Sequence, residues 1–482
     1  MIQDYLTFRA QVSGQATAVV TAARQLTFAE LKDRVRAVAA HLRQLGLPVG
    51  SVVVTCLADK ALDWVLTLAI HHEGLVSCSH LGYSPLEVVH ADWLLSDRKL
   101  SHGDPVRTSV VDWAWLDALP SAVADGGPRA FAAPEAATRL FLTSGTTGQR
   151  KAVALSDRAH LGRVEARGSV FEPFKIFTPM PLGAGVGFNL ALFALVRGAP
   201  LYVAAAGEDA LDLMARHGIE SFVGSPVQIL GLMRAVSAKG GRPASLAVVR
   251  STGGPLSPEL IRGVRERLGA VLVNEYGSTE SGRSALCVVD DEHGTEHACV
   301  ALPGCAIEIV DEAHRPLPPG EEGAVRIRTP YMAQAYHGNV EQSARSFRDG
   351  FFYPGDCGRL ALDGQLQLVG RASEIINRGG VKIDPATIDA IMLEQPCVRD
   401  AAAFAAPGPG GLPEVAAAVV VEEGFDAATF RAALHRRLGY TREPKAILRL
   451  LSIPRTAAGK VQREALAETL MQATGQRSAA SD

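Results

Sequence analysis

The chain reads Leu142-Thr143-Ser144-Gly145-Thr146-Thr147-Gly148-Gln149-Arg150-Lys151 near the end of its first third. Glycine adopts backbone conformations closed to other residues, so the amide N–H groups of such a loop can turn toward one anion. The hydroxyl groups of the run add further donors, and Lys151 adds a positive charge. We therefore expect a phosphate-binding loop. Its predicted contacts are Thr143, Ser144, Gly145, Thr146, Thr147, Gly148 and Lys151.

The residues on either side of this run predict the order strand, loop, helix. Apolar residues at 140–142 are typical of a strand end, and Ser156-Asp157 are typical of a helix cap. A Walker P-loop is excluded, because that motif needs Lys directly after its last Gly and here Gly148 is followed by Gln149. A solvated surface loop stays as an alternative, since Gly, Ser and Thr cluster in most loops.

The run also resembles the phosphate loop of the adenylate-forming superfamily. That superfamily contains acyl-CoA synthetases, the adenylation domains of nonribosomal peptide synthetases, and luciferases. The chain departs from the family pattern at Gln149-Arg150-Lys151, where a proline usually precedes the lysine. A member of the family would carry its other motifs elsewhere along the chain.

Composition limits the class of protein. At 482 residues the chain is too long for one compact core, so two or more domains are expected. The formal charge is −3, and no long basic run stands out, so neither nucleic acid nor an anionic membrane is an expected partner. The first residues lack a basic region followed by an apolar core, and the apolar runs are too short to cross a bilayer.

The cysteines are scattered and form no C-x-x-C pair, so we expect neither a zinc site nor a disulfide framework. Reduced thiols and a cytoplasmic location fit this pattern best. The seven positions are Cys56, Cys78, Cys287, Cys299, Cys305, Cys357 and Cys397.

Helix and strand patterns alternate along the chain. Thr27 and Glu30 predict a capped helix that ends at Gly46. Strand-like and helix-like runs then alternate to about residue 232, which predicts a parallel α/β sheet. Residues 105–134, rich in Pro, Ala, Gly and Asp, read as a connection.

The texture changes near Arg371, where mixed short strands and helices begin. We predict an α/β protein with a large N-terminal domain, residues 1–370, of mixed and parallel β-sheets layered with helices. Residues 371–482 would form a small α+β C-terminal domain. The family resemblance implies that this small domain is mobile.

Two runs resemble the adenine-binding segments of the family. They are Ser251-Thr252-Gly253-Gly254-Pro255-Leu256 and Asn274-Glu275-Tyr276-Gly277-Ser278-Thr279-Glu280. Both follow strand-like runs, and the ends of parallel strands are where α/β sheets bind ligands. The resemblance implies that Gly253, Gly254, Tyr276, Gly277 and Thr279 contact the nucleotide. It also implies that Glu280 holds Mg²⁺, which favours oxygen ligands. Taken alone, Tyr276 is more often a packed aromatic side chain and Glu280 a solvated charge.

Two further runs resemble the ribose-binding and hinge segments. Asp356 ends the run from Gly350, and the resemblance implies that its two oxygens bind both ribose hydroxyls; on its own it would read as a turn aspartate. Arg371 would lie near ribose and phosphate. Ser373 stands at the hinge pivot, where many family members have Asp or Lys. Gly379 and Gly380 would line a narrow tunnel for a thiol arm.

The last motif is Pro454-Arg455-Thr456-Ala457-Ala458-Gly459-Lys460-Val461-Gln462-Arg463, which resembles the C-terminal catalytic loop of the family. A lysine near a chain end would otherwise be read as a solvated charge. The resemblance implies catalytic roles for Lys460, Glu280 and Thr143. It covers nearly the whole chain, and its runs occur in the family order.

The activity implied by this resemblance is ATP- and Mg²⁺-dependent ligation of a small carboxylic acid. A carboxylate would attack the α-phosphorus of ATP to give an acyl-adenylate and pyrophosphate. The thiol of CoA, or of the phosphopantetheine arm of an acyl carrier protein, would then take the acyl group. Rotation of the small domain about Ser373 would move Lys460 out of the active site and bring the thiol tunnel to it.

The identity of the acid stays open. Amino-acid-activating relatives have an aspartate where this chain has Gly185, so an α-amino acid is disfavoured. Gly183, Ala184 and Gly187 leave room for an extended or bulky acyl group, or allow close helix packing. The rival enzymes are a freestanding amino-acid adenylation enzyme and a luciferase-like oxidase. A non-catalytic ATP-binding relative is the alternative from another class.

Overall fold

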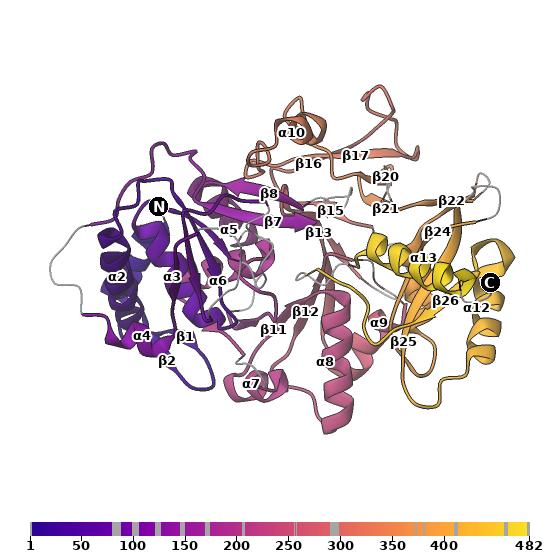
Figure 1. The fold of residues 1–482 in the computed structure, drawn as a ribbon, viewed down its shortest axis with the longest axis horizontal. Helices are drawn as coiled ribbons and strands as arrows, with labels where there is room; N and C mark the ends of the chain where they lie inside the picture. The colour runs from indigo at the N-terminus through magenta and orange to yellow at the C-terminus, as the bar shows by residue number, and fades with distance from the viewer. Residues whose placement is uncertain are drawn as a thin grey trace.

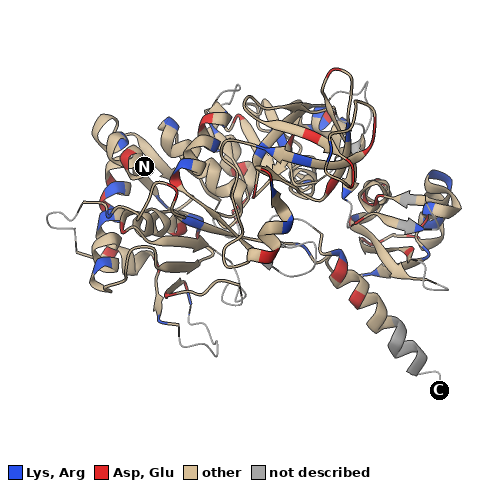
Figure 2. Ribbon diagram, turned by 90° about the horizontal axis from the view of Figure 1, so that it is seen from above, with Lys and Arg blue, Asp and Glu red and all other residues tan. Residues whose placement is uncertain are grey.

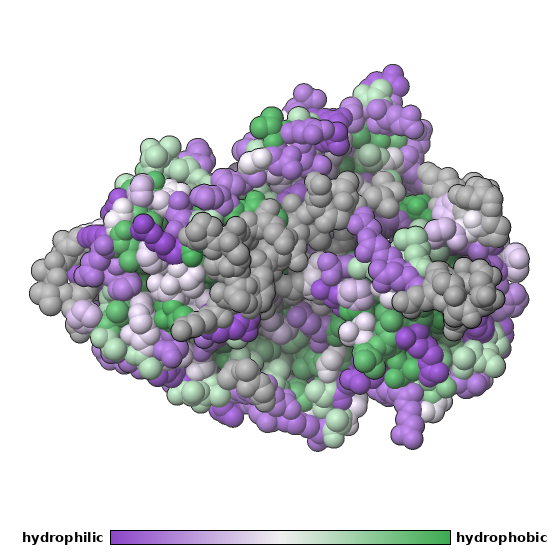
Figure 3. Space-filling model, viewed as in Figure 1, coloured by the Kyte–Doolittle hydropathy of each residue, from purple (hydrophilic) through white to green (hydrophobic). Residues whose placement is uncertain are grey.

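A computed structural model describes residues 2–79, 88–98, 106–120, 127–144, 150–168, 174–204, 208–254, 256, 258–289, 298–371, 374–378, 381–408, 413–456 and 461–479. Figure 1 shows an elongated molecule with the N-terminal elements at one end and a small C-terminal unit at the other. In Figure 2 the acidic and basic residues are interspersed along the ribbon, and helix α13 (Arg463–Ala479) extends away from the body. The face drawn in Figure 3 likewise mixes hydrophilic and hydrophobic residues.

The first sheet contains the strands around the predicted phosphate loop. Its order is β6-β5-β3-β4-β7-β8, and all neighbours pair in parallel except β7 and β8, which form an antiparallel hairpin. The strands are β6 (Thr108–Val110), β5 (Trp93–Ser96), β3 (Val52–Cys56), β4 (Val76–Ser79), β7 (Arg139–Ser144) and β8 (Arg150–Leu155).

The second sheet has nine strands in the order β15-β14-β13-β12-β11-β9-β10-β1-β2. Pairing is parallel from β1 to β13 and antiparallel at both edges, so the predicted parallel α/β sheet is confirmed in mixed form. The strands are β15 (Val300–Ala301), β14 (Gly282–Val288), β13 (Val271–Ser278), β12 (Val248–Thr252), β11 (Ser221–Gly224), β9 (Ile176–Phe177), β10 (Leu201–Tyr202), β1 (Thr17–Val20) and β2 (Gln25–Thr27).

Helices cover and separate these two sheets. The predicted cap of α2 is confirmed, because Thr27 and Glu30 form a capping box. Phe141 of β7 packs on α6 through Phe188 and on α5 through His160, which places these helices beside the first sheet. The helices are α1 (Ile2–Val12), α2 (Phe28–Gln44), α3 (Lys60–His72), α4 (Trp113–Ala118), α5 (Asp157–Gly168), α6 (Gly185–Arg197), α7 (Ala210–His217), α8 (Pro226–Lys239) and α9 (Pro258–Gly263), which continues into a π-helical turn (Val264–Leu268).

A third, antiparallel sheet closes the large domain. It contains β16 (Ala306–Val310), β17 (Gly323–Arg328), β18 (Phe347–Arg348), β19 (Phe351–Phe352), β20 (Asp356–Leu360) and β21 (Leu366–Arg371), with α10 (Val340–Ser346) beside it. A mixed apolar cluster joins it to β14, because Cys287 packs with Ile327 and Leu366. The strands that carry Tyr276, Asp356 and Arg371 are therefore neighbours.

The C-terminal part is a small α+β unit with its own apolar cores. Val398, Phe404 and Ile453 belong to clusters made only of residues beyond 375. Its elements are β22 (Ile376–Arg378), β23 (Val381–Ile383), α11 (Pro385–Leu393), β24 (Val398–Pro407), β25 (Pro413–Val421), α12 (Ala427–Arg442), β26 (Ala446–Arg449) and α13. The predicted fold class, a large layered domain followed by a small α+β domain, is confirmed.

Three details of the fold differ from the sequence predictions. The order at the phosphate loop is strand, loop, strand, then helix, because residues 150–155 pair with β7 before α5 begins. The stretch 105–134, predicted as a connection, contains β6 and α4.

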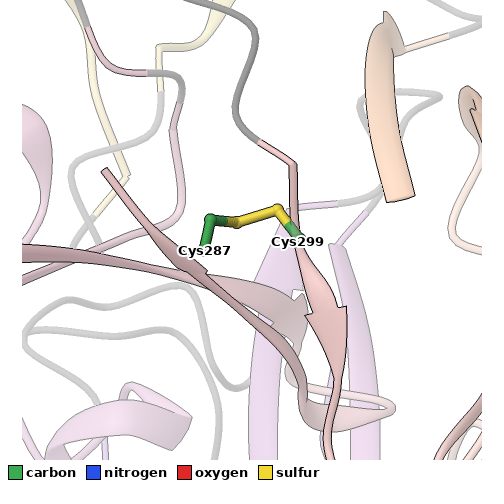
Figure 4. The surroundings of a disulfide bond; sticks show 2 residues. All are labelled: Cys287 and Cys299. Carbon is green, nitrogen blue, oxygen red and sulfur yellow. A yellow bond between two sulfur atoms is a disulfide. The ribbon is translucent and has the colours of Figure 1, made fainter. Parts of the chain in front are cut away.

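The cysteine prediction is also wrong at one pair, since Cys287 and Cys299 form a disulfide (Figure 4). Residues 285–286 of β14 pair with 300–301 of β15, so the two Cα atoms face each other 4.1 Å apart. The spacing of the two cysteines gives no hint of that pairing.

Within the described ranges, no helix combines the length and the apolar character that a bilayer crossing requires.

Candidate active site

Residues from three separate motifs meet at the carboxylate of Asp356. The Tyr276 hydroxyl, on β13, donates to Asp356 Oδ2 at 2.7 Å. Arg371 Nε, on β21, lies 3.1 Å from Asp356 Oδ1. Burial and the neighbouring carboxylate raise the pKa of Tyr276 well above its ordinary value, so its phenol stays protonated and remains a donor.

Arg371 keeps its charge in this partly buried position. Burial alone would lower the pKa of Arg371, but the carboxylates of Asp356 and Glu374 raise it above its ordinary value. A guanidinium, a carboxylate and a phenol ring therefore form one cluster at the junction of β13, β20 and β21. This combination offers hydrogen-bond acceptors to a diol and a flat ring to a base.

A second cluster contains Glu280 and Lys151. The Tyr336 hydroxyl donates to Glu280 Oε1 at 2.9 Å, and Lys151 Nζ lies 4.9 Å from the centroid of the Tyr336 ring. Both charged residues are buried. Burial lowers the pKa of Lys151; the Glu280 carboxylate raises it in part and Arg371 lowers it further. Glu280 stands two residues after the end of β13, the strand that carries Tyr276, so the two clusters lie next to each other.

The turn that carries Thr279 and Glu280 is held by a buried arginine on α5. Arg163 Nη2 donates to the carbonyl oxygens of Thr279 at 3.0 Å and of Glu280 at 3.1 Å. Its Nε donates to the Tyr331 carbonyl at 3.2 Å. Burial lowers the pKa of Arg163 to about 10, so it stays charged at neutral pH. The turn is therefore fixed from behind by a cation.

The strand that presents Tyr276 is anchored through its neighbour Glu275. The Glu275 carboxylate lies 3.0 Å from Arg167, 3.2 Å from Arg283 and 3.5 Å from Arg250. Burial would raise the pKa of Glu275, but these three guanidinium groups lower it below its ordinary value. Successive residues of a strand face opposite sides, so this anchor fixes β13 without filling the space at the Tyr276 ring.

Two glycines of the predicted site, Gly254 and Gly277, lie where there is little room for a side chain. Gly253 has a φ of 81°, in the left-handed region that favours glycine. A Cβ at Gly277 would lie 2.1 Å from the Gly282 carbonyl oxygen, and one at Gly254 would lie 3.2 Å from Pro226. An added Cβ at Gly185 would be 3.7 Å from the Thr279 side chain. The start of α6 is therefore beside the Thr279 turn.

The phosphate loop is described at its two ends only. Thr143 pairs with Lys151 across the β7–β8 hairpin, and Ser144 pairs with Arg150. The predicted contacts Gly145, Thr146, Thr147 and Gly148, and the Ser144 side chain, lie outside the described residues. So do the pivot Ser373, the tunnel residues Gly379 and Gly380, and the catalytic Lys460.

The residues beside the catalytic loop are described. Arg463 donates from Nε to Glu374 at 3.0 Å and from Nη2 to Asp389 at 2.6 Å. It also donates to the Ala403 carbonyl. The residue that ends the Lys460 motif is thereby tied to the segment that follows the predicted pivot.

A cavity of about 530 Å³ lies on the small domain beside His435 and Lys445, away from both clusters, and is not part of the site.

The donor set fits magnesium with a nucleotide. Among the described residues there is no group of three or more His, Cys, Asp or Glu side chains that could hold a metal by themselves. Mg²⁺ bound with nucleotides usually takes one or two carboxylates and completes its shell with phosphate oxygens and water. The buried carboxylate of Glu280, oriented by Tyr336, fits that arrangement.

Sequence reasoning missed Tyr336, Arg163 and the anchors of Glu275. Tyr336 follows Tyr331 in a stretch without a recognised motif, and Arg163 is one of many arginines on helices. Their roles depend on contacts with segments that are far apart in the sequence, and the sequence alone does not show which segments pair.

Comparison with known proteins identifies relatives of this chain. The model of the family described as AMP-binding enzyme matches residues 6–337. A probable CoA ligase of Humulus lupulus is 31% identical over 68% of this chain and 65% of its own length, which is less than two thirds of the relative. The indoleacetate–CoA ligase of Aromatoleum aromaticum is 29% identical over 96% of this chain and 97% of its own. The crystal structure of the anthranilate CoA ligase AuaEII with anthranoyl-AMP superposes with a TM-score of 0.84 at 20% identity, covering 98% of both chains, a likeness of fold.

Proposed function

Because the chain belongs to the AMP-binding enzyme family, the adenylate-forming superfamily of CoA ligases, we propose that it activates a carboxylic acid with ATP and transfers the acyl group to a thiol. The first product would be an acyl-adenylate and the second a thioester. The thiol would belong to CoA, or to the phosphopantetheine of an acyl carrier protein.

The observation that carries this proposal is that Tyr276, Asp356 and Arg371 meet at the end of β13, and that the turn after the same strand brings Glu280 and its neighbour Lys151 next to them. The ribose hydroxyls would donate to Asp356, and the adenine would stack on the Tyr276 ring. Lys151 and the hydroxyl-rich loop would contact the β- and γ-phosphates. Glu280 would hold Mg²⁺, which supplies charge neutralisation for the phosphates when bound.

The chemical step brings one anion to another, so alignment and charge neutralisation supply most of the catalysis. Lys460 would stabilise the carboxylate and the α-phosphate as they approach, and Thr143 would donate to the phosphates. Arg163 would keep Thr279 and Glu280 in place while this happens, since it binds both of their carbonyl groups. Pyrophosphate would leave toward the β7–β8 loop.

We propose further that residues 371–482 turn as a unit about Ser373 between the two half-reactions. Residues beyond 375 have apolar clusters of their own, which supports a boundary near 370/371. The turn would withdraw Lys460 and present Gly379 and Gly380 to the pantetheine arm.

For the acid we favour a medium-chain or aryl carboxylic acid. Gly185 lies beside Thr279, and a glycine there supplies no carboxylate for an α-ammonium group. The second candidate is a freestanding amino-acid adenylation enzyme, which would require that group to be neutralised elsewhere. The indoleacetate–CoA ligase of Aromatoleum aromaticum, at 29% identity, is named for an acid with an aromatic ring, which agrees with this choice.

The decisive experiment is carboxylate-dependent ATP–pyrophosphate exchange across a library of acids, followed by addition of CoA. We expect exchange with medium-chain or aryl acids and thioester formation on adding CoA. Exchange that is fastest with an α-amino acid would favour the second candidate, and no exchange with any acid would refute ligation altogether.

The division of labour is tested with Lys460→Ala. It should abolish exchange but leave thioester formation from supplied acyl-adenylate. Equal loss of both half-reactions would contradict the proposed role of Lys460.

A further inference from the structure

An arginine that no motif predicts is fully buried at the start of β7. Arg139 has no exposed surface. Its Nη2 donates to the Leu182 carbonyl at 2.7 Å and to Ser79 Oγ at 2.9 Å. Its Nη1 donates to Ser77 Oγ at 2.9 Å. Arginine is almost never fully buried unless it is paired, so its contacts need an explanation.

The charge of Arg139 is balanced through a hydroxyl group. The buried Asp63 carboxylate accepts from Thr55 Oγ1 at 2.6 Å and from Ser79 Oγ at 3.0 Å. Ser79 therefore touches both the Asp63 carboxyl group and the Arg139 guanidinium. Burial lowers the pKa of Arg139 to about 10, and Asp63 raises it in part, so the guanidinium stays charged at neutral pH.

Such a network is costly to break one partner at a time, but it is a weak source of stability compared with an apolar core. Removing two ions from water costs several kcal/mol each, and apolar residues of similar volume often replace a buried pair without loss. Stability alone therefore does not account for a guanidinium at this position. The guanidinium instead fixes the positions of its hydrogen-bond partners, because its donors lie in one plane and point in set directions.

The Arg139 guanidinium holds the chain just before α6. Leu182 begins the turn that enters α6 at Gly185, beside the Thr279 turn. The turn is tight, since a Cβ at Gly187 would lie 2.1 Å from the Pro181 carbonyl oxygen. The guanidinium also lies over the Phe188 ring of α6, with 4.4 Å between its central carbon and the ring centroid. From Arg139, β7 leads directly into the phosphate-binding run.

We propose that Arg139 is a positioning residue that fixes the acid-binding turn, residues 182–185, relative to the strand of the phosphate loop through its bond to the Leu182 carbonyl. The proposal rests on the proposed function, because the acid is assigned to that turn. If the turn shifts, the carboxylate loses alignment with the α-phosphate, and a displacement of about 1 Å can reduce the rate by roughly a hundredfold. The nucleotide contacts, which come from other elements, should be spared.

The test compares Arg139→Lys with Ser77→Ala, using the acid that works best for the wild-type enzyme. Lysine keeps a positive charge but replaces the two fixed nitrogens of the guanidinium with one flexible ammonium group, which cannot hold Ser77, Ser79 and Leu182 in their set directions. Ser77→Ala removes a bond to the other nitrogen, Nη1, and leaves the Leu182 bond in place. For each variant the KM for the acid, the KM for ATP, kcat and the melting temperature are measured.

We expect Arg139→Lys to raise the KM for the acid or lower kcat by about tenfold or more, with the KM for ATP within about twofold of wild type. Ser77→Ala should lose thermal stability while both KM values stay near wild type. If Ser77→Ala matches Arg139→Lys in kinetics, or if the KM for ATP rises as much as that for the acid, Arg139 has only a structural role.

Ser79→Ala serves as the second variant in case Arg139→Lys does not fold. It loosens the same nitrogen that holds Leu182 and keeps the arginine, so it should raise the KM for the acid to a smaller extent. An unchanged KM for the acid in this variant would overturn the proposal. A wild-type enzyme that exchanges pyrophosphate with no acid refutes the proposed function instead, so the two failures are distinguishable.

Discussion

The carboxylate of Asp356 divides its two oxygens between two protein partners, the Tyr276 hydroxyl and the Arg371 guanidinium. A carboxylate has about four acceptor sites, so these two bonds leave room for the two hydroxyls of a ribose. The protein partners also prevent the side chain from rotating. The residue is thus oriented before any nucleotide arrives.

Asp356→Asn is predicted to weaken nucleotide binding. The amide keeps the shape of the side chain but loses the charge that faces Arg371 and one of the acceptor oxygens. Hydrogen bonds to charged groups contribute about 1.5–3 kcal/mol, so the KM for ATP should rise roughly tenfold to hundredfold. Steady-state kinetics with ATP varied would measure this. Asp363→Asn, in an exposed turn, is the control, and an unchanged KM in Asp356→Asn would speak against a ribose contact.

Tyr336→Phe is predicted to change the magnesium dependence. The substitution removes the hydroxyl that orients Glu280 but keeps the ring that faces Lys151. The Mg²⁺ concentration for half-maximal exchange should rise severalfold, because a ligand that is not held by its neighbours binds a metal more weakly. Tyr353→Phe, whose hydroxyl accepts from Arg326 on β17, is the matched control. The same magnesium titration curve for wild type and Tyr336→Phe would exclude this role.

At the scale of elements, motifs predict some contacts of the site, whereas other contacts depend on how distant segments pair. Tyr276, Asp356 and Arg371 could be predicted to meet because each stands in a run typical of the family. Strand β8 could not, because residues 151–155 read equally well as the approach to a helix until they pair with β7. Arg139 and Tyr336 stand in no motif, and only their distant partners, Leu182 and Glu280, give them a role.

The start of α6 supplies the next prediction, Gly187→Ala compared with Gly231→Ala. Both glycines lie in helices, but a Cβ at Gly187 would press on the Pro181 carbonyl, whereas one at Gly231 in α8 would meet no atom within 4 Å. We expect Gly187→Ala to lower the free energy of unfolding by about 2 kcal/mol. Gly231→Ala should raise it by about 0.5–1 kcal/mol, since alanine is the better helix former. Denaturant titration measures both, and equal effects would mean that the turn before α6 relaxes freely.

On the scale of the whole molecule, buried histidines link stability to pH. Burial lowers the pKa of His71 and of His160 below the ordinary value of 6.5. Below about pH 6.5 the unfolded chain therefore binds more protons than the folded chain, and stability falls as the pH falls. The expected loss is about 1.4 kcal/mol per pH unit for each histidine that stays neutral in the fold.

Melting temperatures measured in steps of roughly one pH unit, from about pH 8 to about pH 5, would test this loss of stability. His71→Gln and His160→Gln should each flatten the decline below about pH 6.5. Substitution of the exposed His90 is the control. A decline that is as steep in both buried variants as in the wild type would assign the acid sensitivity to other groups.

The Cys287–Cys299 bridge lies between the strand beside β13 and a segment whose backbone pairs with Leu366 of β21. Tyr276 stands on β13 and Arg371 on β21. A laboratory that stores this protein with a dithiol therefore handles a different covalent species from one that stores it in air, and the difference falls next to the nucleotide contacts. Activities from separate purifications become comparable only when the thiol count of each batch is stated alongside them.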